Sequence, residues 1–580
     1  MIKDWFRPYR ITILLFILIA FFLRIPILKV RYFDPDEFQH LHNARQIYYG
    51  EIPYRDYFDH HTPFLHFILA RLYPVFGEEI RILFAARALM LIFTATILCL
   101  TYVLTKKLYG VDAGLFAALF LSYVLIFLEK TIEVRPDLPA AAFWLASVIF
   151  MVNGIQDSRE TASLMWYALS GLSMGTAIMF TQKTLFGLGG IFVALIYPFA
   201  DRRMGISWKQ NLRRMSAFAG ALIVLIILTC GFFLIHKGLW QFINCNFIMN
   251  FHWKAGFTPY GYIKQMLRQN PFFPVIGIMG LLVATVWIYK REEVAKGSFV
   301  PVFCAYSLLA GLFIMPVPYR QYYQLFLPFL AMYSGIIFKE IMEFDIRRLI
   351  PIKLFEKKLS SLWKRLERKG SRGVRPRYTK NHPFSYGLRM LALIVVIVGL
   401  VYTLRYSKPS LPNFKDLLNT RKLTSGILYL ILWIPLIVSA LVTFICNKRA
   451  YAVLLISIGI IAHPLDQMVT QLSEKNDGQL ANIKYVMDST SPWDAVLDGW
   501  SGYGFLRPHA YYYFFLHGEI RAMLSEKELS DDLIESVKQN NTKIVIYDGD
   551  LRALPQRTQE YISANYVPSG QDDIYVRRSQ

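Results

Sequence analysis

The chain has 580 residues, of which 55% are hydrophobic, 16% aromatic and only 18% charged. A soluble chain of this length would divide into several domains with polar surfaces, so this composition excludes an ordinary soluble protein. The formal net charge of +22 would indicate nucleic acid in a soluble protein. In a membrane protein Lys and Arg gather instead in the cytoplasmic loops. The sequence therefore predicts a polytopic membrane protein with no nucleic-acid partner.

Apolar stretches long enough to cross the ~30 Å hydrocarbon core recur along the chain and number about thirteen. They centre near residues 20, 93, 120, 145, 171, 191, 225, 281, 307, 331, 397, 435 and 458. The first follows "MIKDWFRPYR" and has no small-residue cleavage site. This pattern predicts a retained first helix rather than a signal peptide.

Loop charge predicts how these helices are oriented. The most basic loops, such as "DRRMGISWKQNLRR" and the stretch from Lys339 to Lys380, fall on the same side as the N-terminus. Because basic loops stay in the cytoplasm, the N-terminus is predicted to be cytoplasmic and the C-terminus extracytoplasmic. The localisation predicted from this pattern is the plasma or inner membrane, with multiple passes.

The last hundred residues have a different character. "DAVLDGW" and "TKIVIYDG" read as short buried strands, "SEKELSDDLIESVKQN" as a helix and "YVPSGQDDIYVRR" as a hairpin. The predicted organisation is a membrane domain over 1–340, a basic cytoplasmic loop over 341–388, further transmembrane helices over 389–472 and a soluble extracytoplasmic α/β domain over 473–580. The fold class is thus an all-α polytopic membrane protein with a small C-terminal α/β domain.

The stretch "RYFDPDEFQHLHNA", residues 31–44, places acids directly after the first apolar run. Burying a carboxylate beside the membrane is costly, so the pair Asp36 and Glu37 indicates a function. Asp34 precedes Pro35 and has a simpler interpretation as the cap of a helix that begins near Asp36. Residues 40–49 have helical spacing and are expected to lie flat in the membrane interface.

Other polar groups fall in the same set of outer loops. They are Arg55 and His61 in "GEIPYRDYFDHHTPFLHF", Arg135 and Asp137 in "RPD", Lys183 in "TQKT", and Tyr319 and Arg320 in "PYRQYY". Carboxylates surrounded by cations suit a reaction in which a carboxylate takes a proton and cations stabilise a departing phosphate. Simpler interpretations remain open: a local ion pair within "RPD", and snorkelling of Lys183 and Arg320 to lipid headgroups.

Histidines beside acids could also bind a divalent metal, but no ligand spacing such as HExxH is present. The five cysteines show no paired spacing that would indicate a disulfide framework or a zinc site. The sequence-based expectation is a reaction without a metal or another cofactor.

The first outer loop resembles that of a known superfamily. An Asp-Glu pair after the first helix, a "G-x-x-P-Y-x-D" segment leading to "H-x-P", the later "RPD" and an outer C-terminal domain are similar to the GT-C glycosyltransferases. The nearest branches resemble the protein O-mannosyltransferases and the bacterial transferases that add aminoarabinose or galacturonic acid to lipid A. The likeness covers the membrane part to about residue 340 and the overall plan beyond it.

The resemblance implies a polyprenyl-phosphate sugar donor, inversion at the anomeric carbon, and a lipid A or glycolipid, protein or glycan acceptor at the outer face. It implies Asp36 as catalytic base, with Glu37 supporting it or orienting the acceptor. Some lipid A transferases have a Lys-Pro-Pro segment where this chain reads "HHTPF", so His61 stands where their phosphate-binding lysine does. The alternative function is a secondary transporter or flippase of a lipid-linked or anionic substrate, although no internal repeat is evident.

Overall fold

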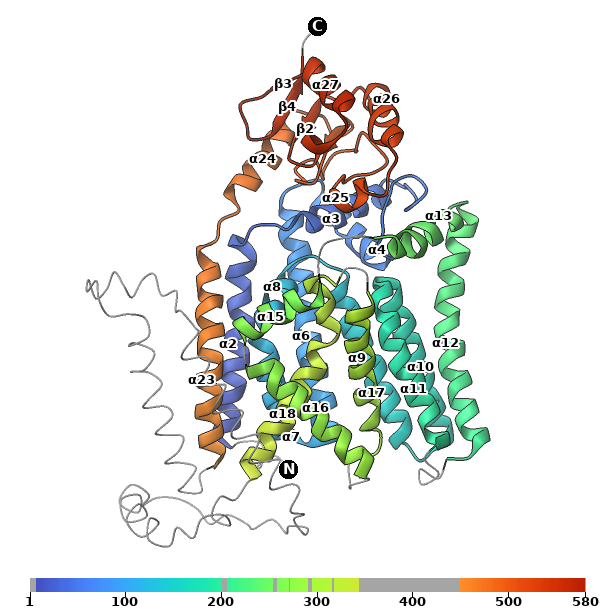
Figure 1. Cartoon of the computed structure of the whole chain (residues 1–580), viewed down its shortest axis with the longest axis vertical. Helices are drawn as coiled ribbons and strands as arrows, with labels where there is room; N and C mark the ends of the chain where they lie inside the picture. The colour runs from blue at the N-terminus through green and yellow to red at the C-terminus, as the bar shows by residue number, and fades with distance from the viewer. Residues whose placement is uncertain are drawn as a thin grey trace, which may run out of the picture.

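The computed structural model describes residues 7–200, 206–253, 258–270, 272–290, 295–315, 318–343 and 449–578. Figure 1 shows a bundle of long helices with a smaller domain, made by the C-terminal residues, above one end of it. Short helices, among them α3 and α4, lie between the two layers. The first described residues lie at the opposite end of the bundle (Figure 1).

Apolar helices make up the bundle. They are α2 (Pro8–Val30), α6 (Arg81–Tyr109), α7 (Val111–Ser122), α8 (Leu125–Ile132), α9 (Asp137–Gln156), α10 (Glu160–Phe180), α11 (Leu185–Ala200), α12 (Trp208–Ile235), α16 (Phe272–Lys290), α17 (Phe299–Ile314), α18 (Leu327–Glu343) and α23 (Arg449–Thr470). Within the described ranges, eight helices are long and apolar enough to cross a membrane, or nine if α7 and α8, bent by 67° at their junction, form one span. The chain is a multi-pass membrane protein.

A helix is present at every predicted apolar centre from residue 20 to residue 331, and again at residue 458. The predicted stretches near 397 and 435, and most of the predicted basic loop over 341–388, lie outside the described residues. The total of about thirteen transmembrane helices therefore stays a prediction.

Short elements lie at the end of the bundle below the C-terminal domain, and several of them line the candidate site. They are α3 (Pro35–Tyr48), α4 (Phe64–Ala70), α5 (Tyr73–Phe76), η1 (Gln182–Thr184), α13 (Leu239–Ile243), η3 (Asn244–Ile248), α14 (Met249–Phe251), α15 (Pro259–Gln269) and η4 (Arg320–Leu325). α3 begins with a capping box, in which the Asp34 carboxylate accepts a hydrogen bond from the backbone N–H of Asp36 and Glu37 accepts one from that of Asp34. The predicted capping role of Asp34 is confirmed.

Most of residues 40–49 belong to α3, and the expectation that they lie flat in the membrane interface stays a prediction. α3 is buried between the bundle and the C-terminal domain, with His40, His42 and Arg45 at most 1% exposed. The His42 ring stacks on Phe514 at 3.9 Å, and Phe38 packs against Phe505. The C-terminal domain thus packs directly on α3 at the end of the bundle.

The C-terminal domain has a four-stranded sheet in the order β1-β2-β4-β3, formed by β1 (Val496–Asp498), β2 (Ile544–Ile546), β3 (Tyr566–Pro568) and β4 (Ile574–Arg577). β1 and β2 are parallel, and the other pairs are antiparallel. Helices α24 (Asp477–Asp488), α25 (Gly518–Arg521), η7 (Glu528–Asp532), α26 (Leu533–Gln539) and α27 (Gln556–Asn565) complete it. The predicted strands, the helix and the hairpin are all present.

The predicted orientation can be tested by cysteine labelling. Lys527 lies on the C-terminal domain, and Arg159 lies between α9 and α10 at the opposite end of the bundle; both side chains are exposed. In a background without the five native cysteines, a membrane-impermeant maleimide should label a Cys at position 527 in intact spheroplasts and a Cys at position 159 only after lysis. The reverse pattern would overturn the orientation.

Candidate functional site

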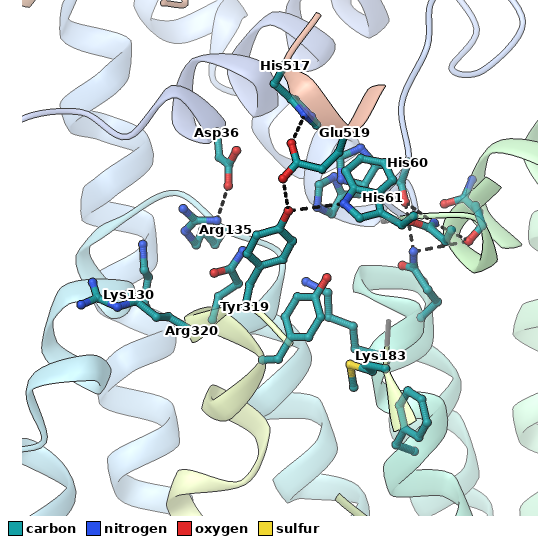
Figure 2. A pocket seen from close by; sticks show the side chains of 18 of the residues that line it. Asp36, His60, His61, Lys130, Arg135, Lys183, Tyr319, Arg320, His517 and Glu519 are labelled. Atoms are coloured by element: carbon teal, nitrogen blue, oxygen red, sulfur yellow. Dashed lines mark hydrogen bonds and ion pairs between the residues drawn. The ribbon is translucent and has the colours of Figure 1, made fainter. Parts of the chain in front are cut away.

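A pocket of about 740 Å³ lies where the bundle meets the C-terminal domain. Cationic side chains line it on the membrane side, and aromatic and acidic side chains line it on the side of the C-terminal domain (Figure 2). On the membrane side these are Lys130, Arg135, Lys183 and Arg320; on the other side they are Trp500, His517 and Glu519. Asp36, His61 and Tyr319 also line it, so the fold brings most of the sequence-predicted residues into one cavity.

Asp36 lies in the first turn of α3 and faces this pocket. Its Oδ2 atom accepts a hydrogen bond from the Arg135 guanidinium, which also pairs with Asp34 at 3.0 Å. The other oxygen, Oδ1, has no hydrogen-bond partner among the residues that the structure describes. One carboxylate oxygen is therefore held in place, while the other can accept a proton.

The charge of Asp36 follows from its surroundings. Burial by itself would raise the pKa of this carboxyl, but Arg135 and Lys130 hold it below its usual value. Asp36 is therefore ionised at neutral pH, as a general base must be. Arg135 is in turn kept charged, because the carboxylates around it raise its pKa despite its burial.

Glu37, next to Asp36, points away from the pocket. Its carboxylate is fully buried and forms a bidentate pair with Arg87 of α6, at 2.6 and 2.8 Å. Arg87 also donates hydrogen bonds to the backbone carbonyls of Leu28, Arg31 and Tyr32. The pair therefore fixes the start of α3, and with it Asp36, to α6 and to the end of α2.

The cations on the membrane side each have an anionic partner. Lys183 bonds to Asp137 at 3.1 Å, and its ammonium lies 3.8 Å from the ring centroid of Tyr322. Asp137 therefore helps to position Lys183, which lines the pocket. Arg320 pairs with Glu129 at 3.2 Å. These pairs border the cavity, so an incoming anion could take up the hydrogen bonds that remain on each cation.

Arg55 and His61 differ in their surroundings from the other sequence-predicted cations. Arg55 lies outside the pocket, where its exposed guanidinium pairs with the adjacent Asp56. His61 lines the pocket, and burial lowers its pKa well below the usual value, so its imidazole is neutral. His61 is therefore suited to a hydrogen bond with the substrate rather than to charge neutralisation.

Asp59, His60 and His61 could together hold a metal ion, since their ligand atoms lie within 4.8 Å of one another. One carboxylate and two neutral imidazoles are a donor set that suits zinc. Oδ1 of Asp59 accepts hydrogen bonds from the backbone N–H groups of His60 and His61 and from Gln39, and its Oδ2 lies 3.1 Å from His66 Nδ1. These contacts give Asp59 a structural role in the loop, and the metal-free reaction stays a prediction.

Comparisons with known proteins find one matching family model and several similar solved structures. Residues 60–232 match the model of the dolichyl-phosphate-mannose-protein mannosyltransferase family. The solved structure of ArnT from Cupriavidus metallidurans bound to undecaprenyl phosphate is similar over 97% of each chain, with a TM-score of 0.60 and 13% sequence identity. The apo form of that protein matches over 97% of this chain and 96% of its own, with a TM-score of 0.60 and 15% identity. The chain therefore shares the fold of ArnT, and part of its membrane domain matches a mannosyltransferase family model. A search of curated protein sequences finds no match.

The pocket also includes residues that the sequence analysis did not single out. They are Lys130, Trp253, Trp500, His517 and Glu519. Lys130 stands in "EKTIEVRPD", five residues before Arg135, so its place in an outer loop was a usable signal. His517 and Glu519 stand in "FLHGEIRA" of the C-terminal domain, and no local pattern indicates that they reach the membrane domain.

Proposed function

We propose that this protein is a glycosyltransferase that moves a sugar from a polyprenyl-phosphate donor to a hydroxyl of a lipid, protein or glycan acceptor at the outer face of the membrane, with inversion. The observation that carries the proposal is the pairing within one pocket of an ionised carboxylate, Asp36, with cations on the membrane side. The similar ArnT structure holds undecaprenyl phosphate, which supports a lipid phosphate as the leaving group.

In the proposed reaction, Asp36 removes the proton from the acceptor hydroxyl through its unpaired oxygen. The acceptor oxygen forms a bond to the anomeric carbon on the face opposite the phosphate, and the bond between that carbon and the phosphate oxygen breaks. The polyprenyl phosphate leaves with the electron pair. Because attack and departure occur on opposite faces, the anomeric configuration inverts.

Negative charge develops on the phosphate as it leaves, and cations near that position stabilise the transition state. We assign this role to Lys183 and Arg320, which line the pocket below Tyr319 (Figure 2). Arg135 is a third candidate, although its main contacts are with Asp34 and Asp36. Since side chains supply the positive charge, the reaction as proposed requires no metal. Arg55 is not assigned this role, because its side chain lies outside the pocket and pairs with Asp56.

The alternative of a transporter or flippase is less well supported. Transporters place their ionisable groups near the bilayer midplane, between broken helices. Here the ionised groups gather at the end of the bundle, against the C-terminal domain (Figure 2). Uptake of a polyprenyl-phosphate sugar into proteoliposomes without any transfer product would favour that alternative.

The phosphate assignment predicts a loss of donor binding. Replacing Lys183 or Arg320 by Ala should weaken binding of undecaprenyl phosphate by about 1.5–3 kcal/mol, or roughly 10- to 160-fold, since each change removes a charge-assisted hydrogen bond. Titration of purified protein in detergent measures the dissociation constant. Arg81→Ala is the matched control, because Arg81 is exposed and pairs with Glu79 outside the pocket. Wild-type affinity in both pocket variants would remove these residues from the phosphate site.

A further inference from the structure

The C-terminal domain forms one wall of the pocket. His517 and Glu519, at the start of α25, reach the same cavity as Asp36 and Arg135 (Figure 2). Trp500, which follows β1, also lines this cavity. The ring centroids of Trp500 and His517 are 4.6 Å apart, and those of His517 and Trp253 are 5.5 Å apart. An aromatic wall with a carboxylate beside it thus faces the cations on the membrane side.

Hydrogen bonds and an ion pair hold this wall in position. The Asp548 carboxylate accepts hydrogen bonds from the backbone N–H of Trp500 at 2.6 Å and from that of Ser501 at 3.0 Å. Glu519 accepts one from the Tyr319 hydroxyl at 2.9 Å and pairs with His517 Nδ1 at 2.8 Å. Tyr319 belongs to the membrane domain, so its hydrogen bond joins the two layers at the pocket.

Glu519 carries a negative charge at neutral pH. The hydrogen bond from His517 is the main cause that lowers the pKa of this carboxyl to about 2, against the opposing effect of burial. Each carboxylate oxygen already accepts one hydrogen bond and has a further lone pair for a ligand. The wall therefore offers a fixed, negatively charged hydrogen-bond acceptor beside aromatic faces.

Such a surface fits one class of ligand. Aromatic faces pack against the apolar face of a sugar ring, and a carboxylate accepts hydrogen bonds from hydroxyl or ammonium groups. A second carboxylate would meet like-charge repulsion in a pocket that is partly shielded from water. The chemistry of this wall thus favours a neutral or amino sugar over a uronic acid.

We propose that Glu519 is a specificity-determining residue that binds the sugar ring of the donor and selects neutral or amino sugars against uronic acids. This inference rests on the proposed function, because a polyprenyl-phosphate sugar has its phosphate bonded directly to the ring. A phosphate held by Lys183 and Arg320 places the ring in the space between these cations and Glu519 (Figure 2).

The test compares donor binding in the absence of acceptor. The probes are undecaprenyl phosphate and its conjugates with mannose, 4-amino-4-deoxyarabinose and galacturonic acid. Wild-type protein should bind the first two conjugates at least about 10-fold more tightly than the galacturonic acid conjugate. Glu519→Gln should bring the three conjugates within about 3-fold of one another, because the amide keeps the shape and loses the charge.

Two controls separate the possible failures. Undecaprenyl phosphate without a sugar should bind equally to wild type and Glu519→Gln, which also shows that the variant is folded. Glu526→Gln, at an exposed carboxylate of the same domain, should keep the wild-type preference. If no lipid phosphate binds to wild type, the proposed function fails. If lipid phosphates bind but the preference is absent in wild type, or is unchanged in Glu519→Gln, the role of Glu519 is refuted.

Discussion

Asp36→Asn should lower the turnover of sugar transfer by about 10²- to 10⁴-fold, the usual contribution of a positioned general base. Asn keeps the shape of the side chain and can still contact Arg135, but it cannot take the proton from an acceptor hydroxyl. Undecaprenyl phosphate should therefore bind to the variant with near wild-type affinity, while kcat falls. Purified proteins assayed with a polyprenyl-phosphate sugar, with thermal unfolding measured alongside, give both quantities.

Asp56→Asn is the matched control, because Asp56 is a carboxylate of the same loop region that pairs with Arg55 outside the pocket. It should retain most of the wild-type turnover. A stable Asp36→Asn protein with wild-type turnover would exclude Asp36 as the base.

The same assignment fixes the direction of a pH effect. Because Arg135 helps to hold the pKa of Asp36 below its usual value, Asp36 stays ionised as the pH falls, and kcat/KM should decline only in strongly acidic buffer. Arg135→Gln removes the opposing charge and leaves the effect of burial, which raises the pKa of Asp36. The acidic limb should then move to higher pH.

Glu37→Gln should destabilise the protein by about 3–5 kcal/mol, the usual cost of removing one partner of a buried ion pair. Glu37 and Arg87 are both fully buried, and the variant leaves the Arg87 charge without its carboxylate. Thermal unfolding in detergent should show a clear fall in the midpoint. Adding Arg87→Met to Glu37→Gln removes the unpaired charge and should recover part of that loss.

The exposed pair of Glu79 and Arg81 provides the control. Glu79→Gln should change stability by no more than about 1 kcal/mol, since exposed ion pairs contribute little. A Glu37→Gln protein as stable as wild type but catalytically impaired would give Glu37 a direct role in the reaction in place of anchoring α3.

The fold could be predicted where the cause is local. Apolar stretches of membrane length gave the positions of the described transmembrane helices, because each must span the same hydrocarbon thickness. The start of α3 was predictable from Asp34 and Pro35, since a cap acts within one helical turn. The strands of the C-terminal domain followed from their short apolar runs in the same way.

The site was predictable only in part, because its geometry depends on contacts between distant segments. Asp36 and Arg135 are 99 positions apart and still form a pair, and the clustering of charges in outer loops was enough to group them. Tyr319 and Glu519 are 200 positions apart, and their contact depends on how the C-terminal domain docks on the bundle. Because Glu37 follows Asp36 in the sequence, the sequence analysis placed both in the site. In the structure Asp36 faces the pocket, while Glu37 faces Arg87.

The central claim is tested most directly by following a polyprenyl-phosphate sugar that carries one label in the sugar and another in the lipid phosphate. With purified protein and an envelope extract as the source of acceptor, the account predicts that the sugar label moves to the acceptor with inverted anomeric configuration. It also predicts that the lipid label appears as polyprenyl monophosphate, and that both changes depend on Asp36. Transfer with retained configuration, or transfer from a nucleotide sugar while the lipid-linked donor stays intact, would contradict the account.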